Sequence, residues 1–241
     1  MAGHSKWKNI QHRKGAQDAK RGKIFTKIGI EITVAARMGG PNPDDNPRLR
    51  AALAKARAAN MPKDNYQRAI KKGSGEGDGA NYLEKTYEGY GPGGVAVFVE
   101  CLTDNVNRTV SEVRHAFSRA GGNLGTDGSV AWMFERKGVI VYERQKVDDF
   151  DRFFELALEN GAEDVKDEQD SVEVVCAPED FQAIRTACEQ LIPDPDFCEI
   201  TMIAKNTTDI DEAQSASLEK MIGVLEDNDD VQSVHHNAST D

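Results

Sequence analysis

Residue types that could perform chemistry are concentrated in two parts of this sequence. The first part is residues 1–27, where eight basic side chains face a single acidic one, Asp18, and where Trp7 stands between Lys6 and Lys8. Ammonium groups suit phosphate contacts, and an indole beside them can stack on an unpaired base. A tryptophan that docks on a neighbouring helical bundle is the alternative interpretation. This arm predicts contact with a polyanion.

The second part is the polar run from Thr103 to Thr109, where an expected strand gives way to an expected helix. We favour the interpretation that Asp104 or Asn105 caps the helix and the others brace the loop. Loops at such junctions also commonly carry binding groups, so the second interpretation is a binding loop made of Asp104, Asn105, Asn107, Arg108 and Thr109. A hydrolase that uses this loop is a third hypothesis, which no other catalytic pattern in the sequence supports.

Other signatures of enzymes, cofactors and metals are weak. The Gly89–Gly94 segment matches GxGxxG, but an expected strand rather than a helix follows it, so we interpret it as a hairpin turn. The histidines are scattered, and Asp227–Asp230 lacks the glycine and glutamate of an EF-hand loop. No GxSxG, Walker or CxxC motif occurs. We therefore expect no catalytic residues, no cofactor and no metal site.

The distribution of charge is more informative than the net value of −11. Residues 1–72 hold 17 Lys and Arg against 5 Asp and Glu, whereas residues 73–241 hold 13 against 36. Such asymmetry predicts a partner that meets one part of the chain. Nucleic acid is favoured over a tail that only solubilises the chain, and over an anionic membrane, which would require more bulky apolar residues before Ile24. The expected nucleic-acid-binding residues are Lys6, Trp7, Lys8, His12, Arg13, Lys14, Lys20, Arg21, Lys23, Lys27, Arg48 and Arg50.

The four cysteines and the hydropathy pattern indicate the compartment. The cysteines mostly stand in apolar runs, so we expect small buried side chains in a reducing cytoplasm rather than disulfides. The longest apolar run, Val95–Val99, is five residues long, far short of the roughly 20 that a membrane helix needs. Neither a secretory signal nor a clear transit peptide is visible. The expected location is cytoplasmic, without a membrane or small-molecule partner.

Apolar spacing, caps and turn residues define the expected elements. Three short helices should follow the arm: one from Ile24 to a stop at Gly39, one from Pro47 to about Asn60, and one from near Pro62 to Lys72. The glycine-rich stretch 73–79 reads as a linker. Beyond it we expect strands at 82–90 and 95–102, a helix at 106–120, an extended segment at 129–134, a βαββαβ unit from 138 to 204, a helix at 211–226 and a strand at 231–235.

This pattern predicts an α+β multidomain protein: an N-terminal helical bundle followed by two α/β domains, one of them ferredoxin-like and inserted into the other. The last helix and strand are too few to fold alone, so we expect them to return to the sheet that begins at Tyr82. The expected domains are residues 1–79; 80–136 with 206–241; and 137–205.

Several motifs then resemble one family. The opening Met1-Ala2-Gly3-His4-Ser5-Lys6-Trp7, Gly39-Gly40, the segments 46–50 (NPRLR) and 60–62 (NMP), and the runs 87–94 and 103–109 together resemble the YebC/PmpR family of probable transcriptional regulators, which also includes a mitochondrial translational activator of cytochrome oxidase. The one departure noticed is Asn42, where aspartate is more usual. The resemblance spans essentially the whole chain and implies three domains, the third inserted into the second.

The resemblance also implies a cytoplasmic, non-enzymatic regulator of gene expression that binds nucleic acid. We expect a DNA-binding transcriptional regulator that acts through the basic arm and bundle. The alternative is a ribosome-associated translation factor that binds rRNA or tRNA and relieves stalled translation. The absence of a clear helix-turn-helix pair disfavours a simple operator reader.

Overall fold

The computed structural model describes residues 21–75 and 81–239. These residues form a mixed α/β fold with a helical bundle and antiparallel sheets, as expected from the sequence. They divide into two compact units. One unit holds the described residues from 21 to 130 together with 211–234, and the other holds 131–210 together with 235–239. The three-domain boundaries given above stay a prediction.

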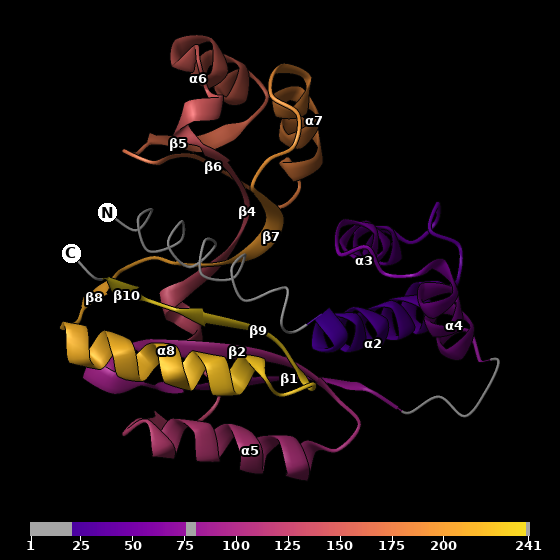
Figure 1. The fold of residues 1–241 in the computed structure, drawn as a ribbon, viewed down its shortest axis with the longest axis vertical. Helices are drawn as coiled ribbons and strands as arrows, with labels where there is room; N and C mark the ends of the chain where they lie inside the picture. The colour runs from indigo at the N-terminus through magenta and orange to yellow at the C-terminus, as the bar shows by residue number, and fades with distance from the viewer. Residues whose placement is uncertain (1–20, 76–80, 240–241) are drawn as a thin grey trace. The chain divides into compact units, whose positions relative to one another are not determined.

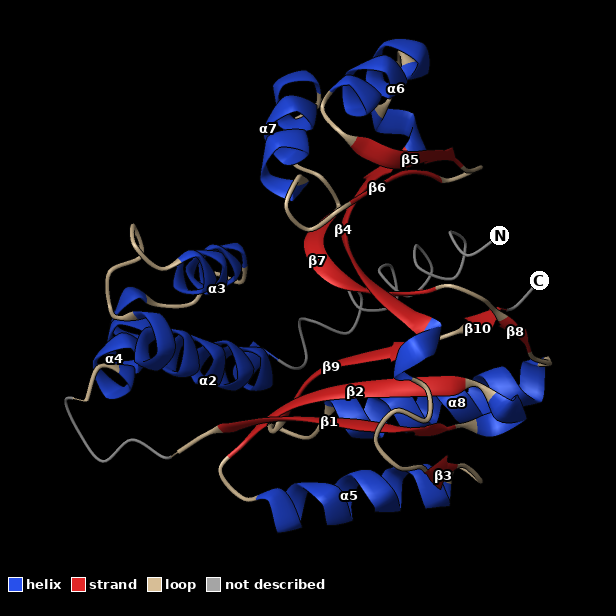
Figure 2. Cartoon of the chain, turned by 180° about the vertical axis from the view of Figure 1, so that it is seen from behind, coloured by secondary structure: helices blue, strands red, loops and turns tan. Residues whose placement is uncertain are grey.

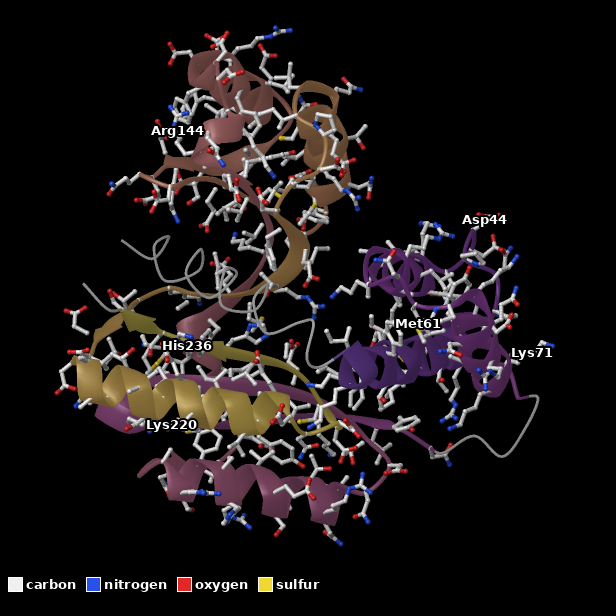
Figure 3. The ribbon with its side chains drawn as sticks, viewed as in Figure 1. Asp44, Met61, Lys71, Arg144, Lys220 and His236 are labelled. Carbon is white, nitrogen blue, oxygen red and sulfur yellow. The ribbon has the colours of Figure 1, made fainter. Side chains whose placement is uncertain are left out.

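Within residues 21–75, the described part of the bundle contains three helices, and the first packs against the other two. They are α2 (Arg21–Gly39), α3 (Pro47–Ala58) and α4 (Lys63–Gly73). Asn46 begins α3 as expected: its side chain accepts a hydrogen bond from the Leu49 amide at 3.0 Å and donates one to the Ala35 carbonyl at 2.7 Å. The Asn46 side chain therefore connects α3 to α2 as well as capping α3. Met61 lies at the centre of the bundle in Figure 3, and it is 8% exposed.

Gly73 permits the close approach of α4 to α2. A Cβ placed on Gly73 would overlap the Thr33 carbonyl oxygen and lie 2.8 Å from the Ala36 Cβ. Any side chain at this position would push the two helices apart, so this glycine is required by packing rather than by backbone conformation.

The same unit contains a four-stranded sheet in the order β3-β1-β2-β9. Helices α5 and α8 lie along it, as Figure 1 shows. The bounds are β1 (Leu83–Tyr90), β2 (Ala96–Thr103), α5 (Val106–Arg119), β3 (Asn123–Leu124), α8 (Glu212–Glu226) and β9 (Val231–His236). Strands β1 and β2 pair antiparallel up to Tyr90 and Ala96, which confirms that the GxGxxG match is a hairpin turn. Helix α8 and strand β9 do return to this part of the chain, as expected.

The second unit has a four-stranded sheet in the order β5-β6-β4-β7, with antiparallel neighbours. This is the strand order of the expected ferredoxin-like motif. Figure 2 shows α6 and α7 on one side of the sheet, where Tyr142 meets Phe153 edge to face at 5.5 Å. The bounds are β4 (Phe134–Glu143), α6 (Phe150–Glu159), β5 (Ala162–Asp167), β6 (Ser171–Cys176), α7 (Phe181–Leu191) and β7 (Phe197–Ala204), with a short parallel pair β8 (Thr208–Asp209) and β10 (Ala238–Ser239).

One expected element is wrong. The segment 129–134 is not extended throughout, because residues 131–133 form a 3-10 helix before β4 begins. The Glu88 carboxylate accepts hydrogen bonds from the Gly128 and Val130 amides at 2.7 and 2.8 Å, and it thereby bends the chain into a tight turn. Among the described residues, no helix is long and apolar enough to cross a membrane.

Candidate nucleic-acid interface

Most of the expected arm residues fall outside the described part of the chain. Lys6, Trp7, Lys8, His12, Arg13, Lys14 and Lys20 precede residue 21, and Arg21 opens α2. The structure therefore bears on four of the expected contacts: Lys23, Lys27, Arg48 and Arg50.

Lys23 and Lys27 are engaged with the C-terminal end of α8. The Lys23 Nζ donates to the Asp227 carbonyl at 2.8 Å, and the Lys27 Nζ donates to the Glu226 carbonyl at 2.6 Å. The last carbonyls of a helix lack partners within the helix and carry partial negative charge, so two ammonium groups stabilise them. These lysines fasten the bundle to α8, some 200 residues away in sequence. No local sequence signal points to this role.

Arg48 connects its own helix, α3, to helix α2 and to strand β1. Its guanidinium binds the Glu31 carboxylate through Nε and Nη2, at 2.7 and 3.0 Å, and also contacts Glu84 at the start of β1. The hydrogen bond to Glu31 is the main reason that the pKa of Arg48 lies above its ordinary value. A bidentate pair of this kind is geometrically specific. In this conformation the guanidinium is occupied by carboxylates, so phosphate would have to displace them.

Among the described residues, Arg50 makes its side-chain hydrogen bonds to backbone oxygens. Its Nη1 donates to the Pro43 carbonyl at 2.7 Å and to the Asp44 carbonyl at 3.2 Å, and its side chain is exposed. Arg50 thus holds the loop before α3 while keeping its charge at the surface. The exposed Arg50 guanidinium is therefore compatible with a phosphate contact.

Further exposed cations, which were not among the residues expected from the sequence, lie on α3 and α4. They are Lys55, Arg57, Lys63, Arg68 and Lys71. Lys71 stands at the outer surface of α4 (Figure 3). Residues 21–75 carry 12 basic and 4 acidic side chains, a net charge of +8. The helical spacing of these cations can be seen in the sequence. The arm has a higher density of basic residues, so the sequence favours the arm as the nucleic-acid-binding segment.

The polar loop is held by contacts within the unit. Asn105 is the N-cap of α5, since its side chain accepts from the Arg108 amide at 3.0 Å, which confirms the capping interpretation and selects Asn105 over Asp104. The Arg108 guanidinium lies between the Asp104 carboxylate at 2.8 Å and the Asp230 carboxylate at 2.7 Å. The Asp230 hydrogen bond is the main cause that raises the pKa of Arg108. Of the two other members, Asn107 is exposed and Thr109 is buried.

Asp230, which sequence reasoning did not identify, holds this loop in place through hydrogen bonds. Its carboxylate is buried and also accepts hydrogen bonds from the hydroxyls of Thr109, at 2.7 Å, and Thr103, at 3.3 Å. One side chain immediately before β9 thereby joins the end of β2 to the start of α5. These contacts explain the polar run as a junction of three elements, and its role as a binding loop stays a prediction.

Catalytic and metal chemistry receive little support from the described residues. Within them, no group of three or more His, Cys, Asp and Glu side chains is placed to hold a metal ion. Cys101, Cys176 and Cys188 are buried as expected, and Cys198 is partly buried. Burial raises the pKa of the Cys101 thiol to about 12 and that of Cys176 to about 11. Thiols of this kind are poor nucleophiles at neutral pH.

These elements define a class of protein: a basic helical bundle is followed in the chain by two four-stranded sheets with their helices, and one sheet has ferredoxin-like strand order. Two family models match the chain, the TACO1/YebC protein N-terminal domain over residues 5–76 and the TACO1/YebC second and third domain over residues 82–238. The chain belongs to the TACO1/YebC family, as the sequence motifs indicated.

Full-length relatives support this assignment. A probable transcriptional regulatory protein of Syntrophotalea carbinolica is 59% identical over 98% of this chain and 95% of its own length. One from Methylococcus capsulatus is 60% identical over 94% and 90%. The crystal structure of a conserved hypothetical protein from Aquifex aeolicus matches with a TM-score of 0.82 at 46% identity, covering 93% of this chain and 92% of that one. The curated relatives are thus named as regulators rather than as enzymes.

Proposed function

We propose that this protein is a nucleic-acid-binding regulator of gene expression that contacts phosphates through its basic arm and helical bundle. The observation that carries the proposal is the segregation of charge. Residues 21–75 have a net charge of +8, whereas residues 131–210, with 8 basic and 20 acidic side chains, have a net charge of −12. A polyanion is attracted to the first segment and repelled by the second. The names of the relatives agree with regulation at the level of the family.

The described contacts divide the bundle cations into two groups. Lys23 and Lys27, through α8, and Arg48, through Glu84 of β1, hold the bundle to the rest of its unit. Exposed cations such as Lys63 and Lys71 extend from α4 into solvent. Phosphate contact therefore belongs to the second group and to the arm. This mode of binding positions the protein on a nucleic acid without reading its sequence.

The direct test is the salt dependence of binding. Fluorescence anisotropy of a labelled DNA duplex, measured across a series of salt concentrations, gives the slope of log affinity against log salt. If about six basic side chains meet duplex phosphates, the slope should lie near −5. A double variant, Lys63→Gln with Lys71→Gln, should make the slope less steep by about 2. Removal of residues 1–20 preserves the α8 contacts of Lys23 and Lys27 and should weaken binding further.

Lys220 supplies the matched control. It is an exposed lysine on α8, outside the bundle (Figure 3), and Lys220→Gln should leave the slope as in the wild type. Equal slopes for the bundle variant and the wild type would exclude the bundle surface. Undiminished, salt-sensitive binding after removal of residues 1–20 would exclude the arm.

A competition experiment assigns the physiological polyanion. Labelled protein is mixed with ribosomes and an excess of genomic duplex DNA near physiological salt, and is then fractionated by sedimentation. Retention on DNA supports the transcriptional role. Comigration with ribosomes despite the DNA makes folded RNA the target and supports the translation-factor alternative. The proposal of nucleic-acid binding fails if the protein associates with neither.

A further inference from the structure

A hollow of about 250 Å³ lies between α2, α4 and the residue that precedes β1. Phe25, Gly29 and Thr33 of α2 form one wall, Arg68 and Lys72 of α4 form a second, and Tyr82 closes a third side. The hollow lies within a single compact unit. Its lining is mostly apolar, with two half-buried aromatic rings and two cations.

The two cations stand one helical turn apart on the same face of α4. The Arg68 guanidinium is exposed and donates to the Asp64 carbonyl at 3.2 Å and to the Asn65 side-chain oxygen at 2.6 Å, neither of which is a carboxylate. The Lys72 ammonium lies 5.8 Å from the centre of the Tyr82 ring and has no carboxylate partner among the described residues. Elsewhere in the described chain, Arg48, Arg108, Lys137 and Arg185 pair with carboxylates. The hollow therefore combines aromatic walls with unneutralised positive charge.

These features select a ligand with a flat, apolar part and an anionic part. A single nucleotide has both: the base can stack on an aromatic ring, and the phosphate can meet the cations. The volume falls just below the roughly 300–1,000 Å³ that drug-sized ligands occupy, so it fits one base rather than several. A base inside a duplex is stacked and paired and cannot enter, so the occupant must be unpaired. An apolar peptide would leave both cations without an anionic partner.

We propose that this hollow holds one unpaired nucleotide of the bound nucleic acid, with the base against Phe25 and Tyr82 and its phosphate at Arg68 and Lys72. The inference rests on the proposed function and makes it more specific: the protein distinguishes nucleic acid that has a single-stranded end, bulge or loop from a plain duplex.

The test compares two forms of one probe bound to the full chain. The first form is a fluorescein-labelled single strand of about ten nucleotides, within the usual range of single-strand sites, and the second is the same strand annealed to its complement. Tyr82→Leu removes the ring but keeps an apolar side chain beside Ile30 and Leu102, with which Tyr82 packs. It should weaken single-strand binding by about 5- to 150-fold, the usual effect of losing one stacked base, and leave duplex binding unchanged. Tyr82→Phe should bind the single strand as the wild type does.

Adjacent lysines give the matched charge control. Lys71→Gln and Lys72→Gln remove the same charge one residue apart, but only Lys72 lines the hollow. Lys71→Gln should lower the affinity for both probe forms by similar factors, whereas Lys72→Gln should lower single-strand affinity by a clearly larger factor. Equal effects of the two variants on the single strand would overturn the site.

Crosslinking tests the position without any variant. A single strand that contains a photoreactive thiopyrimidine should crosslink to peptides that contain Phe25 or Tyr82, and crosslinks confined to other peptides would overturn the proposal. Normal duplex binding with no effect of Tyr82→Leu on the single strand would remove the nucleotide site and leave the proposed function standing. Failure to bind either probe form at low salt would remove both.

Discussion

Replacement of Asp230 by alanine should lower the free energy of unfolding of its unit by about 3 kcal/mol. The carboxylate accepts from the Arg108 guanidinium at 2.7 and 2.9 Å and from two threonine hydroxyls. Hydrogen bonds to charged groups contribute about 1.5–3 kcal/mol each when buried. The full sum does not apply, because the Arg108 side chain is 43% exposed and can be hydrated in the variant. The Thr109 hydroxyl also keeps its 3.0 Å contact with the Asn105 carbonyl.

Urea denaturation followed by far-ultraviolet circular dichroism measures this loss. Asp229→Ala is the matched control: Asp229 is the exposed neighbour of Asp230, and its removal should change stability by less than about 0.5 kcal/mol. A double-mutant cycle between Asp230→Ala and Arg108→Ala should give a coupling free energy of about 1–2 kcal/mol. If Asp230→Ala were as stable as Asp229→Ala, the junction would not depend on this carboxylate, and the role of Asp230 in holding the polar loop would be refuted.

Three further predictions concern stability. Gly73→Ala should destabilise the bundle, because its Cβ overlaps α2, whereas Gly223→Ala, with open space around the new Cβ within helix α8, should stabilise the protein by up to about 1 kcal/mol; urea midpoints measure both. Asn105→Ala removes the N-cap of α5 and should cost about 1 kcal/mol, whereas unchanged midpoints would contradict the capping role. Burial raises the pKa of the Cys101 and Cys198 thiols to about 12. The folded state therefore retains protons that the unfolded state releases above about pH 9, so the free energy of unfolding should fall as pH rises from there toward 12. Urea titrations at several pH values should show this fall, and the thiols should react with a thiol reagent at pH 8 only after unfolding.

The sequence predicts the elements well where local signals decide them. Asn46-Pro47 starts α3, Gly39-Gly40 ends α2, and the apolar stripe after Asn105 forms α5, all as expected. Caps, turns and hydrophobic periodicity act over a few residues, so one segment carries the whole signal. The hairpin at Gly89–Gly94 follows in the same way from the strands on either side of it.

Contacts between distant segments account for what the sequence could not predict. The turn before β4 depends on the Glu88 carboxylate, about 40 residues earlier. The two-residue strands β3, β8 and β10 exist through pairing and carry no periodicity of their own. In the polar loop, Asn105 could be recognised as a cap from its position, but the Asp230 partner of Arg108 lies 122 residues away. A short range of sequence cannot specify such a pair.

Contacts between distant segments also determine which cations can bind a polyanion. Lys23, Lys27 and Arg48 read as phosphate ligands because the segment around them is basic, yet each has an oxygen partner within its own unit. A phosphate that displaced Arg48 from Glu31 would leave that carboxylate without its cation, so part of the binding free energy would be lost in breaking the bidentate pair. Lys63 and Lys71 meet no such competition from a carboxylate among the described residues, and Lys72 faces an aromatic ring rather than an acid. Among the described residues, polyanion contact should therefore shift from Lys23, Lys27 and Arg48 toward α4 and the hollow beside it.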